Sequence, residues 1–290
     1  MIVVVGTVCV DRVSRISQWP ERGGYADIES TRIFPGGEAL NTAVGLARLG
    51  ADVVLVGSAL ADDEEGDLIR DFLAQEGLSA QWAIHPVRTP SCDVFVDAGG
   101  ERTMLGNGFL DLAEFGLPDL PDAPAGTWVT VEPNLGPVAH AVWREAARRD
   151  WRRYAMDFWR SGDPLAPGDW HQTSTDWVGF RGEREGLMAW LETQRSSGVS
   201  TVVTDGARGL AVMIPGEPVR WVEAWPLVEP LDSTGAGDQF RAGMLWGLDS
   251  GMPVAEALHW GMACGALNCR SEGGCLGAAT RSEVEALGRR

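Results

Sequence analysis

The order of apolar and polar positions along the chain predicts an alternation of buried strands and amphipathic helices. Short apolar runs bounded by turn-forming residues occur at 2–5, 53–56, 128–131 and 201–204, as is typical of strands covered on both faces. Elsewhere apolar residues recur at three- and four-residue spacing, which is typical of helices. These patterns predict helices at 40–47, 62–76, 138–146, 183–194, 235–248, 254–267 and 281–287, with further strands at 154–158 and 177–180.

This alternation predicts an α/β protein, a three-layer α/β/α sandwich whose central sheet is mainly parallel. Two segments break the rhythm. Residues 13–34 contain Pro20 and alternating apolar positions, and residues 91–106 have the pattern of a hairpin that turns at Gly99 and Gly100. Because no helix follows either segment, we expect a small separate β-sheet inserted in a single domain of residues 1–290. This sheet is either a lid or an ordinary surface excursion.

Charge changes the picture by excluding mechanisms. The chain has 290 residues, 41 acidic and 24 basic, with a formal net charge of −17, and every basic residue is arginine. The lack of lysine excludes mechanisms that need a Walker A lysine, the strand lysine of protein kinases or a lysine that forms a Schiff base. The acidic excess argues against nucleic-acid or anionic-membrane partners, which require basic surfaces. Any phosphate must be held by backbone amides, arginine or a metal.

Cysteine and histidine positions give no metal pattern. The five cysteines contain no CxxC pair and the four histidines lie far apart, so no structural zinc site is predicted. The apolar N-terminal run is too short to span a membrane and lacks a basic region before it, which favours a strand over a signal peptide. We therefore expect a cytoplasmic protein with reduced thiols.

The segment Asp232-Ser-Thr-Gly-Ala-Gly-Asp238 stands immediately before a predicted helix. Glycine allows a ligand to approach the backbone, and the first turn of a helix leaves N–H groups unpaired. Together with the helix dipole these groups form an anion site that needs no lysine. Asp238 at its mouth can act as a general base towards a substrate hydroxyl. The alternative is that Asp238 only complements the helix dipole.

A second polar segment precedes the first predicted helix. Gly36 and Gly37 permit close approach of a ligand, and Asn41 offers both a donor and an acceptor to the hydroxyls of a polyol. Asp11 follows the first strand, where α/β sheets place ligands. Each feature also has a structural interpretation, since Gly-Gly turns, Asn in turns and acids at loop entries are common.

The two segments together carry a specific resemblance. Residues 36–66, with GGEALNTA and glycines at 57 and 66, and residues 232–245, with DSTGAGD and QFRAGML, resemble the two signatures of the ribokinase-like, phosphofructokinase-B family of carbohydrate kinases. The resemblance implies a three-layer body with a β-sheet lid, ATP as phosphate donor, Mg²⁺, and phosphorylation of a hydroxymethyl group on a sugar or nucleoside. Family members often pair through their lids, so it also implies a homodimer.

The resemblance also implies roles for matching residues. Asp238 corresponds to the catalytic base, and Gly235, Ala236 and Gly237 to the anion hole. The implied substrate contacts are Asp11, Gly36, Gly37, Asn41 and Glu132; the implied nucleotide contacts are Thr204, Gly206, Gly209 and Thr234. Glu185 corresponds to an acid near Mg²⁺. Asp232 and Thr234 resemble part of a K⁺ site, with Ser271 and Gly273 as partners.

Three positions depart from the family pattern. Gly182 stands where an Asn near the metal is common, and Cys9 and Glu38 replace an Asn and a Lys of ribose kinases. The last two weaken the case for ribose. A sugar or sugar-like acceptor is the leading hypothesis. A nucleoside kinase of the adenosine or inosine type, or a regulator that kept the fold and lost turnover, are the alternatives.

Overall fold

The computed structural model describes residues 1–98, 102–115, 119–158, 164–195, 198–226 and 230–288. In this part of the chain a nine-stranded sheet has the order β13-β12-β11-β10-β9-β8-β1-β4-β5. The parallel part of the sheet consists of β11, β10, β9, β8, β1, β4 and β5. Strands β12 and β13 are added antiparallel at the β11 edge. The strands are β1 (Ile2–Gly6), β4 (Val53–Gly57), β5 (Ser79–Gln81), β8 (Trp128–Val131), β9 (Arg152–Met156), β10 (Trp170–Ser174), β11 (Ser200–Thr204), β12 (Gly209–Met213) and β13 (Arg220–Glu223).

Helices cover both faces of this sheet, as the central strand β1 shows. Successive strand residues point to opposite faces. Ile2 and Val4 join the apolar cluster of one helical layer, whereas Val3 and Val5 join that of the other. The first layer contains α1 (Glu38–Arg48), α2 (Glu64–Gln75), α6 (Ala236–Asp249), α7 (Val254–Asn268) and α8 (Arg281–Leu287); the second contains α4 (Pro137–Arg148) and α5 (Arg184–Thr193). The predicted three-layer α/β/α class is confirmed.

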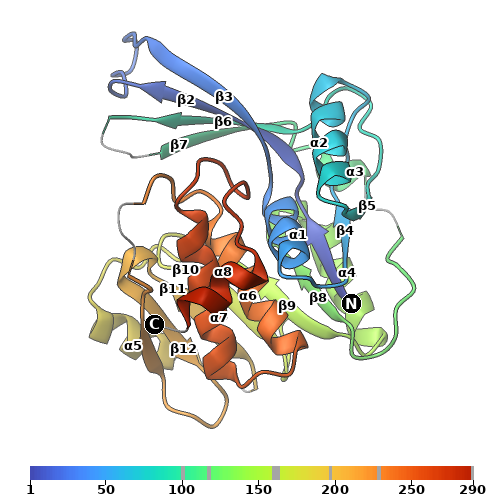
Figure 1. Cartoon of the computed structure of the whole chain (residues 1–290), viewed down its shortest axis with the longest axis vertical. Helices are drawn as coiled ribbons and strands as arrows, with labels where there is room; N and C mark the ends of the chain where they lie inside the picture. Colours follow the sequence, from blue (N-terminus) through green and yellow to red (C-terminus); the bar gives the residue numbers. More distant parts are fainter. Residues whose placement is uncertain (99–101, 116–118, 159–163, 196–197, 227–229, 289–290) are drawn as a thin grey trace.

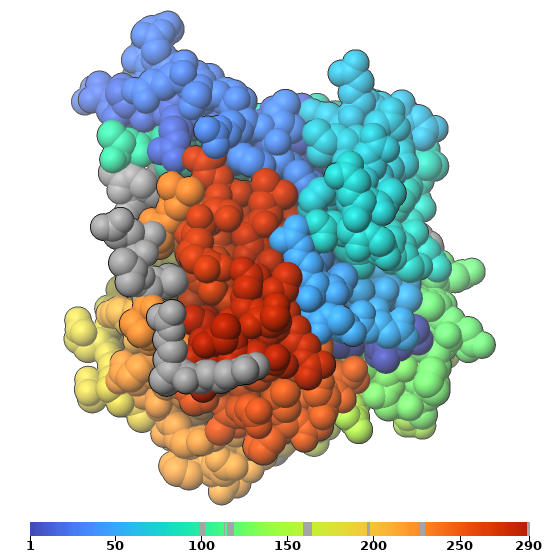
Figure 2. Space-filling model, in the orientation of Figure 1, coloured from blue at the N-terminus to red at the C-terminus, as the bar shows by residue number. Residues whose placement is uncertain are grey.

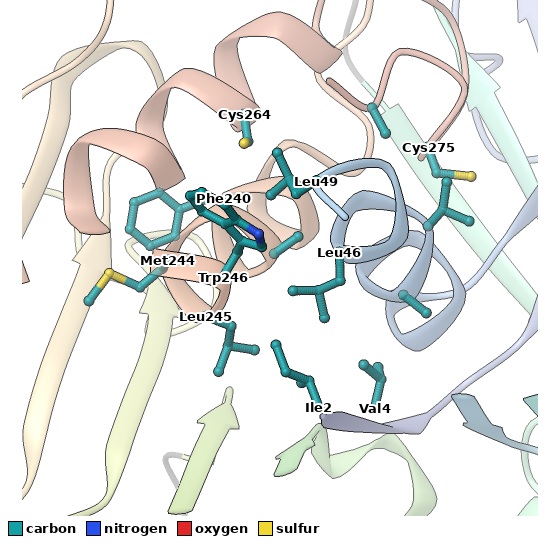
Figure 3. Close-up of a cluster of buried hydrophobic side chains, with 14 of the residues drawn as sticks. Ile2, Val4, Leu46, Leu49, Phe240, Met244, Leu245, Trp246, Cys264 and Cys275 are labelled. Carbon is teal, nitrogen blue, oxygen red and sulfur yellow. The ribbon is translucent and has the colours of Figure 1, made fainter. Parts of the chain in front are cut away.

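The first layer positions α6 through a dense apolar contact (Figure 3). Phe240, Met244 and Leu245 of α6 lie with Leu46 of α1 above Ile2 in this cluster of buried side chains. Each is at most 4% exposed, and burying such a side chain contributes about 1.5–3 kcal/mol. This contact packs the middle of α6 against the C-terminal half of α1.

A second, four-stranded sheet stands apart from the first (Figure 1). It consists of β2 (Cys9–Ile16), β3 (Ile28–Gly36), β6 (Ser91–Val96) and β7 (Arg102–Asn107), in the order β3-β2-β6-β7. The predicted small separate sheet is confirmed, although its first strand begins before residue 13. The turn predicted at Gly99 and Gly100 lies outside the described residues.

The prediction of a strand at 177–180 is wrong, because these residues form a turn and the strand is β10 at 170–174. Its sequence, WHQTS, is polar, yet its first four residues are buried. Hydrogen bonds of its side chains to the site described below make this burial tolerable. The strand predicted at 154–158 is β9 at 152–156, and β5, β12 and β13 were not predicted.

Three short helices complete the described structure: α3 (Leu112–Phe115), η1 (Pro133–Leu135) and η2 (Gly206–Arg208). Across the described ranges, no helix combines the length and apolar character needed to cross a membrane.

Candidate active site

The site lies at the carboxyl ends of the parallel strands, where α/β sheets bind ligands. Glu132 follows β8, Asp157 follows β9, Thr175 follows β10 and Asp205 follows β11. All four side chains are buried. The first helical layer adds Asp238 from α6, which is only 5% exposed. The parallel topology thus gathers polar residues that are far apart in the sequence.

The Asp238 carboxylate is held at both oxygens. Asn41 Nδ2 of α1 donates a hydrogen bond to Oδ2 at 2.9 Å, and Arg241 Nη2 donates to Oδ1 at 3.3 Å. Because a carboxylate only accepts, the nitrogen of the Asn41 amide must face Asp238. The buried Asn41 Oδ1 has no partner among the described residues. Its hydrogen-bonding capacity is therefore unused within the described structure.

The acidity of Asp238 reflects competing influences. Burial raises its pKa from 3.8 to about 7, although the charge of Arg241 and the hydrogen bond from Asn41 lower it. The neighbouring carboxylates Glu132 and Asp157 raise the pKa further. A carboxylate with a pKa near 7 is well matched to accept a proton at neutral pH.

The backbone before Asp238 offers free N–H donors. Gly235, the N-cap of α6, has a φ of 72°, and a Cβ there would lie 1.9 Å from Gly274 O. Ala236 N–H already donates to Ser233 O at 3.2 Å. In the described structure no acceptor is present for the N–H groups of Gly235, Gly237 and Asp238. A Cβ on Gly237 would meet no atom closer than 3.7 Å, so an anion has room to approach.

The predicted substrate residues also come together. Pairing of β2 with β3 places Asp11 over Gly36, where a Cβ would lie 2.2 Å from Asp11 Oδ2. Gly37 packs equally tightly, since a Cβ at this position would lie 2.4 Å from Thr7 O. Burial raises the pKa of Asp11 from 3.8 to about 6, with a smaller opposing effect of the Cys9 hydrogen bond. Only glycine fits these close approaches.

Glu132 lies close to both Glu38 and Asp238. It is fully buried and accepts hydrogen bonds from the backbone N–H of Thr7 and from that of Asn134. Asn134 Nδ2 in turn donates to Glu38 Oε1 at 2.9 Å. Burial, with the charges of Glu132 and Asp238, raises the pKa of Glu38 well above its ordinary value. Three carboxyl groups, those of Glu38, Glu132 and Asp157, therefore lie around Asp238.

A cavity of about 540 Å³ opens on the other side of the α6 N-terminus. Thr204, Gly206 and Gly209 line it, as predicted for nucleotide contacts, together with Ala236 and Gly237. Its remaining wall is largely apolar and contains Leu210, Trp225, Pro226, Phe240, Met262 and Ala266. An apolar wall suits a flat base, and the free amides at one end suit phosphates. The cavity fits a nucleotide.

Beside it a second cavity of about 520 Å³ is lined by Gly182, Glu183 and Arg208. Glu185, the predicted Mg²⁺ ligand, lies exposed in the first turn of α5 and does not line this cavity. No group of three acidic, His or Cys side chains within the described ranges forms a metal cluster. This donor set fits Mg²⁺ that is held mainly by nucleotide phosphates and water.

Asp232 joins two loops. Its Oδ1 accepts hydrogen bonds from Thr234 N at 2.9 Å and Thr234 Oγ1 at 2.7 Å, and its Oδ2 accepts from Gly273 N at 3.0 Å. Ser271 N–H instead donates to Asn268 O. Of the four residues predicted for a K⁺ site, Thr234 and Gly273 are thus both hydrogen-bonded to Asp232, and the K⁺ itself stays a prediction.

The small sheet contacts the body through arginines. Arg15 of β2 and Arg32 of β3 both form ion pairs with Glu272, and Arg102 Nη1 of β7 donates to Thr234 Oγ1 at 2.8 Å. Arg15, Arg32, Arg102 and Glu272 line a cavity of about 410 Å³ between the two parts. Figure 2 shows the blue strands of the small sheet lying directly over the orange and red C-terminal part of the chain. The small sheet therefore contacts the loops that carry Thr234 and Glu272, next to the start of α6.

This fold and site define a nucleotide-dependent kinase, and comparison with known proteins agrees. The family model described as pfkB family carbohydrate kinase matches residues 1–118 and 173–281. A fructokinase from Klebsiella pneumoniae is 31% identical over 82% of this chain and 87% of its own. An ATP-dependent ribose-1-phosphate kinase from Halopiger xanaduensis is 29% identical over 94% of this chain and 93% of its own.

Among solved structures, a ribokinase from Cryptococcus neoformans in complex with ADP has a TM-score of 0.81 at 22% identity, covering 99% of both chains. The chain belongs to the pfkB family of carbohydrate kinases. It is an ATP-dependent enzyme of that class, and the suspected ribokinase-like relationship is confirmed.

Sequence reasoning missed several residues that build the site. Arg241 lies within a helix whose apolar residues dominate the pattern, and Gln172 lies in a strand that the hydrophobic pattern did not predict. Glu272 lies in a loop. Gln172 Nε2 donates to Gly237 O at 2.9 Å, and Tyr154 OH donates to Gln172 Oε1 at 2.9 Å. The polar run WHQTS and the charge three residues after Asp238 were the available signals.

Proposed function

We propose that this kinase transfers the γ-phosphoryl group of ATP, with Mg²⁺, to a hydroxymethyl group of a sugar or sugar-like acceptor. The observation that carries this proposal is the position of Asp238. Its buried carboxylate lies at the start of α6, next to free backbone amides, between the nucleotide cavity and the polar group formed by Asp11, Gly36 and Asn41.

The residues divide the chemistry between them. Asp238 accepts the proton of the acceptor hydroxyl as its oxygen attacks the γ-phosphorus in line with the departing ADP. The amides of Gly235 and Gly237 stabilise negative charge on the transferred group. Mg²⁺, when bound, would neutralise charge on the phosphates; it would be held mainly by those phosphates and water, because Glu185, the acid expected near it, is exposed and lines neither cavity. Thr204, Gly206 and Gly209 flank the bound nucleotide, whereas Thr234, also expected there, does not line this cavity and has its hydroxyl hydrogen-bonded to Asp232 and Arg102.

The acceptor is held on the opposite side. Asp11 accepts hydrogen bonds from its hydroxyls, Asn41 Oδ1 accepts another, and Gly36, Gly37 and Glu132 shape the pocket. The small sheet acts as a lid, because closure over the acceptor excludes water from the reaction. Glu38 lies next to this pocket where ribose kinases have a Lys. We therefore expect a hexose such as fructose rather than ribose, in keeping with the similarity to a fructokinase.

The test is a coupled ADP-release assay with ATP and Mg²⁺ across D-fructose, D-ribose, ribose 1-phosphate, adenosine and inosine. We expect acceptor-dependent turnover with a sugar, and a loss of at least about 100-fold in Asp238→Asn. Turnover with nucleosides alone would assign a nucleoside kinase. Absence of turnover with every acceptor despite ATP binding would favour a regulator, and equal rates for Asp238→Asn and the wild type would refute the role of Asp238.

A further inference from the structure

Arg241 is a fully buried arginine directly behind the proposed base. It is 0% exposed and lies one helical turn after Asp238 on α6. Its Nε donates to Thr42 Oγ1 at 2.9 Å, and its Nη2 donates to Glu38 O at 2.8 Å as well as to Asp238 Oδ1 at 3.3 Å. Burying a charge is costly unless it is paired and hydrogen-bonded, and this guanidinium meets both conditions.

The contacts of Arg241 reach the start of α1 at two points. Thr42 and Glu38 both belong to α1, which also carries Asn41, the other partner of the Asp238 carboxylate. Arg241 therefore fixes Asp238 relative to the element that presents Asn41 to the acceptor. With Oδ1 bonded to Arg241 and Oδ2 to Asn41, rotation of the carboxylate would break one bond or both.

The surroundings of Asp238 are otherwise acidic. Glu38 faces it from α1, Glu132 from the end of β8 and Asp157 from the end of β9, while the Cys275 thiol approaches from the C-terminal loop. The positive charge of Arg241 lowers the pKa of Glu38, Asp157 and Asp238 alike. Each carboxylate raises the pKa of its neighbours, so removal of this cation favours protonation of the base.

We propose that Arg241 is a positioning residue for phosphoryl transfer, which orients the Asp238 carboxylate through Oδ1 and keeps it ionised within a buried group of acids. This inference rests on the proposed role of Asp238 as general base. It predicts that the contribution of Arg241 to the rate depends on pH. A purely structural contribution would be the same at every pH.

The experiment compares Arg241→Met, Arg241→Lys and a matched control, Arg153→Met, with the wild type. Arg153 forms another largely buried ion pair, with Asp169 at 2.8 Å, away from the base. The pH dependence of kcat/KM is measured with ATP, Mg²⁺ and the acceptor of highest turnover in the panel above. Thermal denaturation of each variant is measured in parallel, to separate loss of folding from loss of rate.

For Arg241→Met we expect the acid limb of kcat/KM to move up by about 1–3 pH units, so that a loss of at least about 10-fold at pH 7 recovers at alkaline pH. Arg241→Lys keeps the charge, and its acid limb should stay closer to that of the wild type. Arg153→Met should lower the melting temperature without moving the limb. A uniform loss at every pH in Arg241→Met, or an unchanged profile, would overturn the proposal.

A second measurement needs no acceptor. The ¹³C carboxyl resonance of Asp238, assigned by its loss in Asp238→Asn, is titrated in the wild type and in Arg241→Lys and Arg241→Met. We expect a higher pKa in Arg241→Met, and equal values would contradict the proposal. If Asp238→Asn retains full turnover, the proposed base is wrong whatever the titration shows, so the two failures are distinguishable.

Discussion

Two glycines at the start of α6 differ sharply in their surroundings, and this difference predicts opposite effects of the same substitution. A Cβ on Gly235 would lie 1.9 Å from Gly274 O, and its φ of 72° is left-handed. A Cβ on Gly237 would meet nothing closer than 3.7 Å, and this residue lines the nucleotide cavity. Gly235→Ala therefore perturbs the fold and the site, whereas Gly237→Ala perturbs the site alone.

The magnitudes follow from these contacts. In Gly235→Ala the left-handed backbone costs about 1–2 kcal/mol, and relief of the overlap with Gly274 O costs about 1–3 kcal/mol more. The melting temperature should fall by about 3–8 °C. Gly237→Ala lies within the helix, where alanine is favoured by about 1 kcal/mol, so its stability should be unchanged or higher. Its methyl group occupies space beside the free amides, and a displacement of about 1 Å in phosphate position costs about 100-fold in kcat.

The assay combines differential scanning calorimetry with coupled ADP release. Gly251→Ala is the matched control for backbone strain, since Gly251 has a φ of 73° with no atom within 4 Å of a Cβ and lies beyond the far end of α6. This control should lose about 1–2 kcal/mol without loss of kcat. Wild-type kcat in Gly237→Ala would refute the assignment of the amides to phosphate. A Gly235→Ala variant as stable as Gly251→Ala would refute the packing argument.

Three further predictions concern single carboxylates. Burial raises the pKa of Asp11 from 3.8 to about 6. The buried charge therefore destabilises the fold by about 3 kcal/mol above pH 6, and this destabilisation is absent below pH 3.8. Asp11→Asn should raise the melting temperature at pH 8 but not at pH 4, and an equal effect at both pH values would contradict this. Glu272→Gln breaks the ion pairs with Arg15 and Arg32, so acceptor KM should rise several-fold in steady-state kinetics while stability changes by less than about 1 kcal/mol. A fall in kcat with unchanged KM would show that these ion pairs do not hold the small sheet over the acceptor. If Asp232 belongs to a K⁺ site, replacing KCl by tetramethylammonium chloride should lower kcat in the wild type and not in Asp232→Ala.

The sequence predicts those parts of the fold that depend on apolar periodicity. β8 and α8 have the bounds that the pattern indicates, because their burial is achieved by apolar side chains. β10 was missed because Gln172 and Thr173 are buried by hydrogen bonds to Tyr154 and Asp157. Such partners come from other strands, and a local pattern contains no information about them.

The same limit applies to the site. Glycine-rich segments indicate Asp238 and Asn41 separately, because close approach of a ligand restricts the local residue types. That Asn41 donates to a carboxylate 197 residues away follows only from the packing of α1 on α6. Arg241 is hidden for the opposite reason, since a charge within a helix normally indicates a solvated position, whereas here it is the buried partner of Asp238.

The absence of lysine explains why the α6 amides and Arg241 are both needed in the proposed mechanism. A chain with a net charge of −17 repels a polyanionic nucleotide, and Arg208 beside the nucleotide cavity is itself paired with Asp205 at 2.9 Å. The α6 amides are donors that no carboxylate in the described structure occupies, and their orientation costs no reorganisation during transfer. Arg241 cannot supply a phosphate contact, because its donors face Asp238 and α1. In the proposed mechanism its charge instead acts on the Asp238 carboxylate, so the two tasks are separate: the backbone binds the phosphate and the arginine orients the carboxylate.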